Sequence, residues 1–169
     1  MVEVYKDENP NTDYTYIWAG TPFENPVRFS VHEMHSGHLG KSWDQQGVMN
    51  IESINGVYKV KITSYGKYRI TLCRYPLESG YKINQHVPAM KKSTEVVSPL
   101  TESDSIKLVK SHLYIADIEG AESIKNVNEN DCGVSYESCF YEGKYDMQAF
   151  FTDDKGINYP AYYIYIEKL

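Results

Sequence analysis

The stretch from Gly56 to Glu78 constrains the fold more than any other part of this chain. Apolar or aromatic side chains alternate with polar ones on both sides of a short turn at residues 64–67. The alternating positions are Tyr58, Val60 and Ile62 before the turn, and Tyr68, Ile70 and Leu72 after it. Because successive side chains of a strand point to opposite faces, this pattern predicts a β-hairpin with one buried face. The three- and four-residue spacing of an amphipathic helix is missing here.

Short strand-like segments recur through the rest of the chain. They are Tyr14–Ala19, Val27–Val31, Val48–Ile51, Tyr81–Val87, Lys110–Ile118, Ile124–Val127, Ser135–Tyr141, Tyr145–Phe151 and Tyr162–Glu167. Many short strands with frequent turns are typical of antiparallel sandwiches. The sequence therefore predicts an all-β fold, an antiparallel two-sheet β-sandwich of jelly-roll-like type with little or no helix. A weak helical pattern is confined to Thr101–Val109.

One domain is expected over residues 14–169, after a polar N-terminal linker at residues 1–13. A chain of 169 residues has the size of a single domain and buries a core without disulfides or metals. From Ser79 to Ser105 the strand pattern disappears, which predicts a long surface excursion. Gly66-Lys67-Tyr68 and Gly143-Lys144-Tyr145 open two strands in the same way, so one local turn solution is used twice.

Composition excludes several classes of function. The net charge is −6 and the longest basic cluster is Lys91-Lys92, so no nucleic-acid surface is expected. No apolar run is long enough for a membrane span, and the N-terminus is too polar for a signal peptide. Cys73, Cys132 and Cys139 have no C-x-x-C spacing and predict neither a disulfide framework nor a zinc site. Free thiols are favoured, and pairing of Cys132 with Cys139 stays open.

Catalytic and metal-binding patterns are weak. His32, His35 and His38 share neither one helix face nor one strand face, so we expect loop hydrogen bonds there and no metal site. There is no G-x-S-x-G motif and no glycine-rich phosphate loop. The paired carboxylates Asp153-Asp154 and Glu102/Asp104 fall in expected turns, where a solvated role is favoured over acid–base catalysis.

Candidate binding residues are aromatic rings near an arginine. Sixteen tyrosines suit half-buried strands, and also a carbohydrate-binding face. Trp18, Trp43, Arg74 and Tyr75 suggest stacking on a sugar or capture of an anion, with a structural ion pair of Arg74 as the favoured alternative. We expect the loop His32–Trp43 and the segment Arg74–Glu78 to form one rim, with binding residues Trp43, Arg74, Tyr75, His32 and His35. In the alternative, Arg74 pairs with Glu78 or Glu33 and only locks that rim.

Ordered motifs across residues 16–167 resemble the C-terminal region of bacterial arylsulfatases, the part that follows the catalytic domain. The matching segments, in family order, are Glu24–Val27, Ser30–His35, Trp43 with Gln45, Gly56–Val60, Gly66–Glu78, Phe151–Gly156 and Ala161–Tyr165. The sequence departs from the family pattern at two places. Glu33-Met34 stands where the family has the Asp-Trp of H-D-W, and Cys73-Arg74-Tyr75-Pro76 stands where it has R-R-W-P.

The resemblance implies a non-catalytic accessory domain of an arylsulfatase, packed in cis on the catalytic domain and shaping its cleft for a sulfated glycan. The formylglycine motif C-x-P/S-x-R is missing, so we expect no sulfate-ester hydrolysis by this chain and no cofactor in it. Calcium is expected only in the catalytic domain. The implied parent protein is exported to the periplasm or outside the cell.

An autonomous carbohydrate-binding module is the alternative reading. Such a module should expose a row of Trp or Tyr on one sheet face or loop rim, whereas a docking domain should expose a broad apolar patch.

Overall fold

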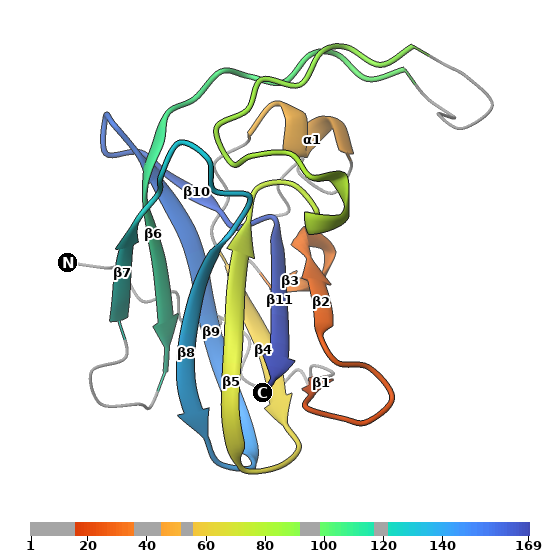
Figure 1. Ribbon diagram of the computed structural model, residues 1–169, viewed down its shortest axis with the longest axis vertical. Coiled ribbons are helices and arrows are strands. Elements are labelled where there is room, and N and C mark those ends of the chain that lie inside the picture. Colours follow the sequence, from red (N-terminus) through yellow and green to blue (C-terminus); the bar gives the residue numbers. More distant parts are fainter. Residues whose placement is uncertain (1–15, 36–44, 52–55, 92–98, 117–121) are drawn as a thin grey trace.

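The computed structural model describes residues 16–35, 45–51, 56–91, 99–116 and 122–169. About half of this part of the chain is strand, arranged in two sheets that face each other (Figure 1). The predicted β-sandwich is therefore confirmed.

The larger sheet, sheet A, has the strand order β1-β4-β9-β6-β7, with β3 added beside β4 and β10 beside β9. Its strands are β1 (Ile17–Ala19), β3 (Met34–His35), β4 (Val57–Ile62), β6 (Leu108–Ile115), β7 (Glu122–Asn126), β9 (Gly143–Asp153) and β10 (Asn158–Pro160). Neighbouring strands are antiparallel except β1 and β4, which are parallel.

The smaller sheet, sheet B, has the strand order β2-β11-β5-β8 and is antiparallel throughout. Its strands are β2 (Val27–Ser30), β5 (Gly66–Cys73), β8 (Val134–Phe140) and β11 (Tyr163–Lys168).

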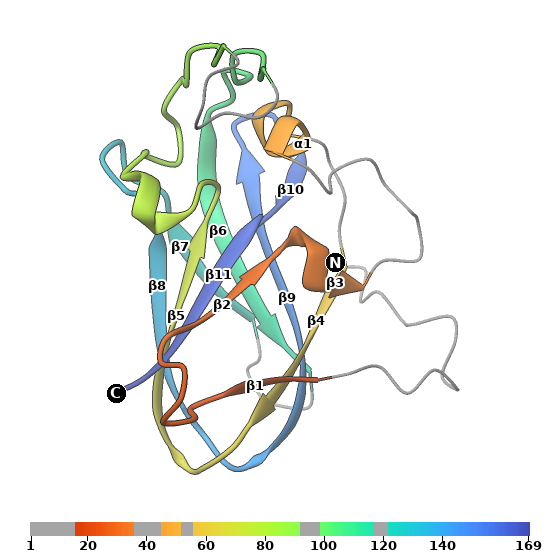
Figure 2. The same cartoon turned by 90° about the vertical axis from the view of Figure 1, so that its right-hand side faces the viewer.

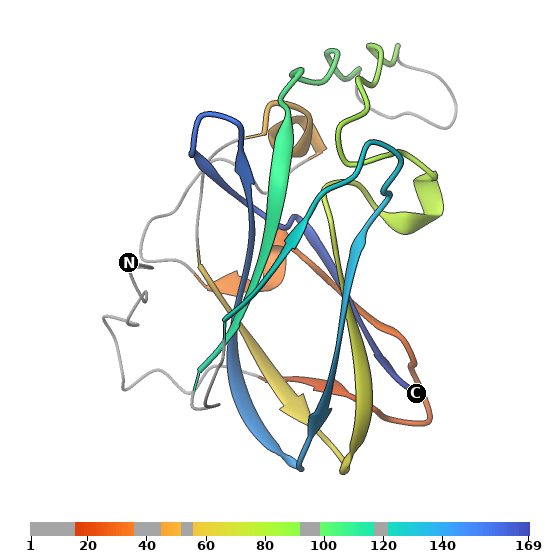
Figure 3. The same ribbon diagram turned by 60° about the vertical axis from the view of Figure 1, so that its left-hand side comes forward.

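The predicted hairpin at Gly56–Glu78 is wrong in its pairing. Strand β4 belongs to sheet A and β5 to sheet B, so the turn at residues 63–65 carries the chain from one sheet to the other. We call such a connection an arch. Residues 141–142 make a second arch, from β8 to β9, and the two arches turn at the same end of the molecule (Figure 3). The repeated Gly-Lys-Tyr sequence thus opens the strand that follows each arch.

The core lies between the sheets and is built from the alternating positions of the sequence. The alternating apolar side chains of β4 and β5 point inward from different sheets, so they face each other across the core. The buried core positions of these two strands are Tyr58, Val60, Ile62, Tyr68, Ile70 and Leu72. The Tyr136 hydroxyl on β8 donates to Ser111 on β6 across the sandwich, so at least one buried polar group ties the two sheets together.

Three expectations for local structure are wrong. Val48–Ile51 is no strand, because Gln45–Met49 forms a short helix, α1. Tyr81–Val87 and the start of Thr101–Val109 have neither strand nor helix, and β6 begins at Leu108. Two single-turn 3₁₀ helices, η1 (Val31–Glu33) and η2 (Leu77–Ser79), follow β2 and β5.

The excursion after Ser79 is packed on the domain in its described parts. Ile83 and Val87 are buried, and the Asn84 side chain makes two hydrogen bonds with the backbone of Leu108, both 2.9 Å long. Together with α1, this segment covers the end of the sandwich opposite the arches (Figure 2). We call this the capped end.

Candidate functional site

Two exposed tyrosines meet where the two arches lie side by side. Tyr65 sits in the first arch and Tyr141 in the second, with ring centroids 5.0 Å apart. They are 62% and 73% exposed, although large aromatic side chains usually hide most of their surface. Since β4 pairs with β9 and β5 with β8 up to the last residues before each turn, the sheets fix the spacing of the two arches.

A layer of buried and partly buried aromatic rings supports this pair. Tyr68 and Tyr145 each pack edge-to-face on Phe140, with ring centroids 5.8 and 5.3 Å away. The Tyr145 hydroxyl donates to the carbonyl oxygen of Tyr141, 3.1 Å away. The Tyr68 hydroxyl donates to the carbonyl oxygen of Ser64, next to Tyr65. Both arches are therefore held by side chains beneath them, which makes the pair a preorganised surface.

Strand β1 adds a third aromatic ring beside the first arch. Trp18 is 58% exposed, and its neighbour Ala19 accepts two hydrogen bonds from Thr63 through its carbonyl oxygen. Figure 2 shows β1 crossing the sandwich towards the end where the arches turn, away from α1. We call the surface formed by Trp18, Tyr65 and Tyr141 the aromatic end.

The predicted rim residues that the structure describes lie at the capped end. Ser30 of β2 and Cys73 of β5 both pair with Tyr163 of β11, so the chain leaves both strands at the same end of sheet B. The described part of the His32–Trp43 loop and the segment Arg74–Glu78 are thus on the same side of the fold, as expected. Trp43 and His38 lie outside the described residues. His32 is exposed and His35 is partly buried, and each makes interactions within the chain.

Arg74 is not at the surface, which corrects the expectation that it meets a ligand there. It is only 1% exposed, and its Nη2 donates to the carbonyl oxygens of Met49 and Asp104, 3.3 and 3.0 Å away. Burial lowers the pKa of Arg74. Its Nε and Nη1 have no hydrogen-bond partner within the described part of the chain. Arg74 is therefore a buried link that holds α1 and the excursion against the sandwich.

The proposed ion-pair partners of Arg74 are engaged elsewhere. Glu78 accepts a hydrogen bond from the Tyr165 hydroxyl, which is the main reason that its pKa is lowered. Glu33 caps η1 by accepting from the backbone and the hydroxyl of Ser30. Tyr75 is also buried, with its hydroxyl donating to the carbonyl oxygen of Gln85. The two members of the predicted site at residues 74 and 75 thus stabilise the capped end.

Metal-site geometry is not found in the described residues, where no group of three or more His, Cys, Asp or Glu side chains converges on one point. No helix in that part of the chain has the length and apolar character that crossing a membrane requires.

Comparisons with known proteins give no family assignment. No family model and no curated protein matches the sequence. Three solved structures show a distant likeness. They are a GH26-CBM35 β-(1,4)-mannanase of Podospora anserina (9% identity, TM-score 0.41), a ruminal GH26 endo-β-1,4-mannanase (9%, 0.40) and the CBM35 of Cellvibrio japonicus Abf62 (10%, 0.36).

The coverage of the three structures differs. This chain aligns over 86%, 92% and 86% of its own length, in the same order. It spans 28% and 27% of the two mannanase chains, and 88% of the CBM35 chain.

Proposed function

We propose that this chain is a non-catalytic carbohydrate-binding module whose ligand platform is the aromatic end. The observation that carries the proposal is the exposure of Tyr65, Tyr141 and Trp18 on a supported surface. Covering an exposed aromatic ring with an apolar face of a ligand is favourable, because it removes apolar surface from water. The flat face of a sugar ring is large enough to do so. The platform is built on two arches fixed by both sheets, so little conformational entropy is lost on binding.

The distribution of the other exposed hydrophobic side chains favours a binding module over a docking domain. Outside the aromatic end, the exposed large hydrophobic residues of the described chain lie in the β1–β2 connection, on η2, on β7, in the β9–β10 turn and at the C-terminus. They are Phe23, Leu77, Ile124, Ile157 and Leu169. They come from separate elements, whereas a docking face needs a contiguous apolar area. The exposed rings of the aromatic end are instead gathered around two adjacent arches.

A specific observation also favours the accessory domain of a sulfatase as a second candidate. Segments that carry the resemblance contact each other at the capped end. Gln45 Nε2 donates to the Tyr163 hydroxyl at 2.9 Å. In this candidate, the capped end would pack on a catalytic domain in an exported parent protein. A C-x-P/S-x-R motif upstream in the same reading frame would support it, and a reading frame without one would count against it.

Polysaccharide binding tests the main proposal directly. Isothermal titration against a panel of soluble plant, algal and bacterial polysaccharides should find at least one ligand. The double variant Tyr65→Ala/Tyr141→Ala should then bind at least ten times more weakly, because it removes both arch rings. Trp18→Ala should also weaken binding.

A matched control is Ile157→Ala, which removes an exposed hydrophobic side chain that is 46% exposed in a turn outside the aromatic end. It should bind as wild type does. All variants should melt within a few degrees of wild type, because exposed side chains contribute little to stability. Absence of binding across the whole panel, or full affinity of the double variant, would refute the proposal.

A further inference from the structure

Two lysines lie beside Trp18 in one row across sheet A. Trp18 on β1 is in register with Lys61 on β4, and Lys61 is in register with Lys144 on β9. The neighbouring residues of β4, Val60 and Ile62, are buried, so Lys61 points to the outward face of the sheet. The Lys61 ammonium is 5.0 Å from the centre of the Trp18 ring. We call Trp18, Lys61 and Lys144 the β1 row.

The adjacent row differs in its charge balance. Lys59 forms an ion pair with Asp146, with 2.8 Å between Nζ and Oδ2, so its charge is compensated. Lys144 instead lies over the ring of Tyr16, with its ammonium 4.6 Å from the ring centre. Within the part of the chain that the structure describes, neither Lys61 nor Lys144 has a carboxylate within salt-bridge distance. The β1 row thus carries two uncompensated positive charges.

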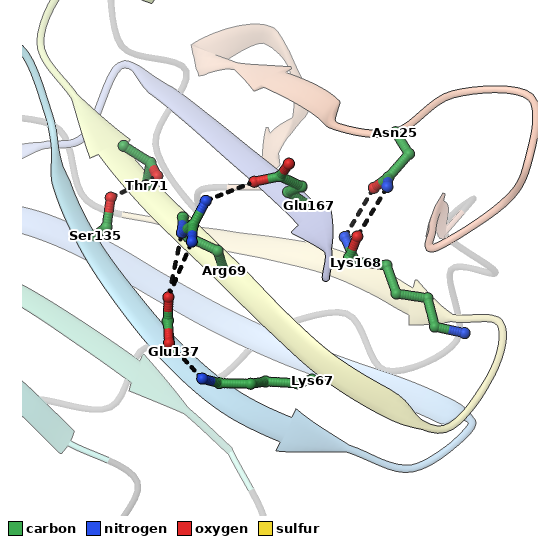
Figure 4. Close-up of polar contacts among 8 residues, drawn as sticks. All are labelled: Asn25, Lys67, Arg69, Thr71, Ser135, Glu137, Glu167 and Lys168. Carbon is green, nitrogen blue, oxygen red and sulfur yellow. Dashed lines mark hydrogen bonds and ion pairs between the residues drawn. The ribbon is translucent and has the colours of Figure 1, made fainter.

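The outward face of sheet B shows what compensated cations look like in this protein. Figure 4 shows Arg69 between Glu137 and Glu167, with Lys67 on the other oxygen of Glu137. The Nζ and guanidinium contacts there range from 2.6 to 3.1 Å. The chain has 23 acidic against 17 basic side chains, so carboxylate partners are plentiful. Two neighbouring lysines without such partners therefore stand out as a site for an external anion.

The chemistry of the β1 row defines the class of ligand. The exposed indole of Trp18 offers an apolar surface for a sugar ring, and two ammonium groups beside it attract a negative substituent on that ring. Lysine is a point charge without the planar fork of arginine, so it accepts a carboxylate or a sulfate ester equally well. A protein with a net charge of −6 attracts a polyanion only where positive charges are clustered on its surface. This row supplies such a cluster.

We propose that the β1 row binds an anionic sugar residue of a polysaccharide, a hexuronate or a sulfated sugar, through stacking on Trp18 and ion pairing with Lys61 and Lys144. This inference rests on the proposed carbohydrate-binding function and specifies its ligand.

Matched pairs of polymers separate charge from sugar recognition. Polygalacturonate is compared with its fully methyl-esterified form, and a sulfated galactan with the same galactan without sulfate. We expect the charged member of at least one pair to bind at least ten times more tightly than its neutral partner. Binding of the carboxylate pair alone or of the sulfate pair alone identifies the source of the anion. Raising the salt concentration from 50 to 500 mM should weaken this binding, because ion pairs near the surface are screened.

Charge-removing variants test the residues. Lys61→Gln/Lys144→Gln should reduce the affinity for the charged polymer at least tenfold more than it reduces the affinity for a neutral polymer. The control Lys67→Gln/Lys110→Gln removes the same charge from sites outside the row and should bind as wild type does. Polyglutamate tests charge alone, and it should bind much more weakly than the charged polysaccharide.

The outcomes distinguish this inference from the function on which it rests. Equal affinity for charged and neutral members of both pairs, or an unchanged Lys61→Gln/Lys144→Gln variant, overturns the anionic ligand and leaves carbohydrate binding standing. Polyglutamate binding as tight as that of the polysaccharide, and insensitive to Trp18→Ala, overturns recognition of a sugar at this row. Failure to bind any polysaccharide refutes the function itself.

Discussion

Arg74 shows how one residue can serve a role opposite to that which its chemistry suggests. An arginine at the end of a strand, next to a tyrosine, is expected at a ligand rim. Here the guanidinium is enclosed by α1, the excursion and the Tyr75 ring, whose centre lies 4.8 Å away. Among the described residues, two of its nitrogens have no hydrogen-bond partner, and burying such a charge is costly. The hydrogen bonds that Arg74 makes to two backbone carbonyls therefore have to stabilise the capped end.

Substitution of Arg74 should therefore affect stability. Arg74→Ala takes the guanidinium donor from the Asp104 carbonyl oxygen, leaves the Met49 carbonyl oxygen with only the Asp104 amide, and opens a cavity. We therefore expect a loss of about 2–4 kcal/mol of unfolding free energy. Arg74→Met fills more of the space and buries no charge, so it should lose less than the alanine variant. Urea unfolding measures both.

The control for Arg74 is Arg69→Ala, which removes a more exposed arginine from the surface network of Figure 4. Its effect should be much smaller, because exposed ion pairs contribute little. An Arg74→Ala variant as stable as Arg69→Ala would show that the buried guanidinium does not hold the capped end.

At the scale of elements, the position of the first arch depends on close packing of the end of β1 against the core. Gly20 follows β1 with a φ angle of +81°, and a Cβ placed there would collide with the ring and hydroxyl of Tyr68. Tyr68 is buried and holds the first arch through its hydrogen bond to Ser64. The end of β1, the buried ring and the arch are therefore one packed unit.

Gly20→Ala should destabilise the domain more than Gly80→Ala or Gly156→Ala does. The left-handed backbone costs a non-glycine residue about 1–2 kcal/mol, and the clash with Tyr68 adds an overpacking cost of about 1–3 kcal/mol. Gly80→Ala and Gly156→Ala are matched controls, because their φ angles are +68° and +84° and no atom lies within 4 Å of the added Cβ. Chemical denaturation should rank Gly20→Ala clearly below both controls, and equal losses at the three sites would contradict the packing of Tyr68 against Gly20.

At the scale of the whole molecule, the two ends of the sandwich have different physical characters. The capped end buries polar and titratable groups under irregular chain, whereas the aromatic end displays rings in water. Five buried groups have pKa values raised chiefly by burial. They are the hydroxyls of Tyr58, Tyr136, Tyr159 and Tyr165, and the Cys73 thiol, and the pKa of that thiol is raised to about 12. Each favours its neutral form in the folded state.

This arrangement predicts a loss of stability at alkaline pH. A group whose pKa is raised by folding contributes fully below its unfolded pKa, and the contribution disappears as the pH rises towards the folded value. With ordinary values of about 8.5 for cysteine and about 10 for tyrosine, the melting temperature should be constant near pH 7–8 and should fall above about pH 9.

Circular dichroism melts from pH 6 to 11 test this dependence. Cys73→Ala should make the decline above about pH 8.5 shallower, and the control Cys139→Ala should not, because Cys139 is exposed. A melting temperature that stays constant up to pH 11 would contradict the assigned burial of these groups.

The candidate site could be found only partly from the sequence. The sequence supplied the criterion that a binding module exposes Trp or Tyr on a loop rim. Trp18 was among its aromatic candidates. Tyr65 and Tyr141 were missed because Tyr65 reads as an ordinary turn residue and Tyr141 as the last residue of an expected strand. Their signal was the repeated Gly-Lys-Tyr sequence just after each of them, since two similar turns become neighbours when the flanking strands pair.

The sequence by itself determined which side chains are buried along each strand, because the two-residue period of a strand assigns every residue to a face. It therefore established Tyr58, Val60, Ile62, Tyr68 and Leu72 as core and the chain as a β-sandwich. It did not determine pairing partners, because two strands joined by a short turn show the same alternation whether they share a sheet or face each other across the core. Only tertiary packing decided that β4 and β5 lie in different sheets, that Arg74 is enclosed, and that two arches bring Tyr65 and Tyr141 together.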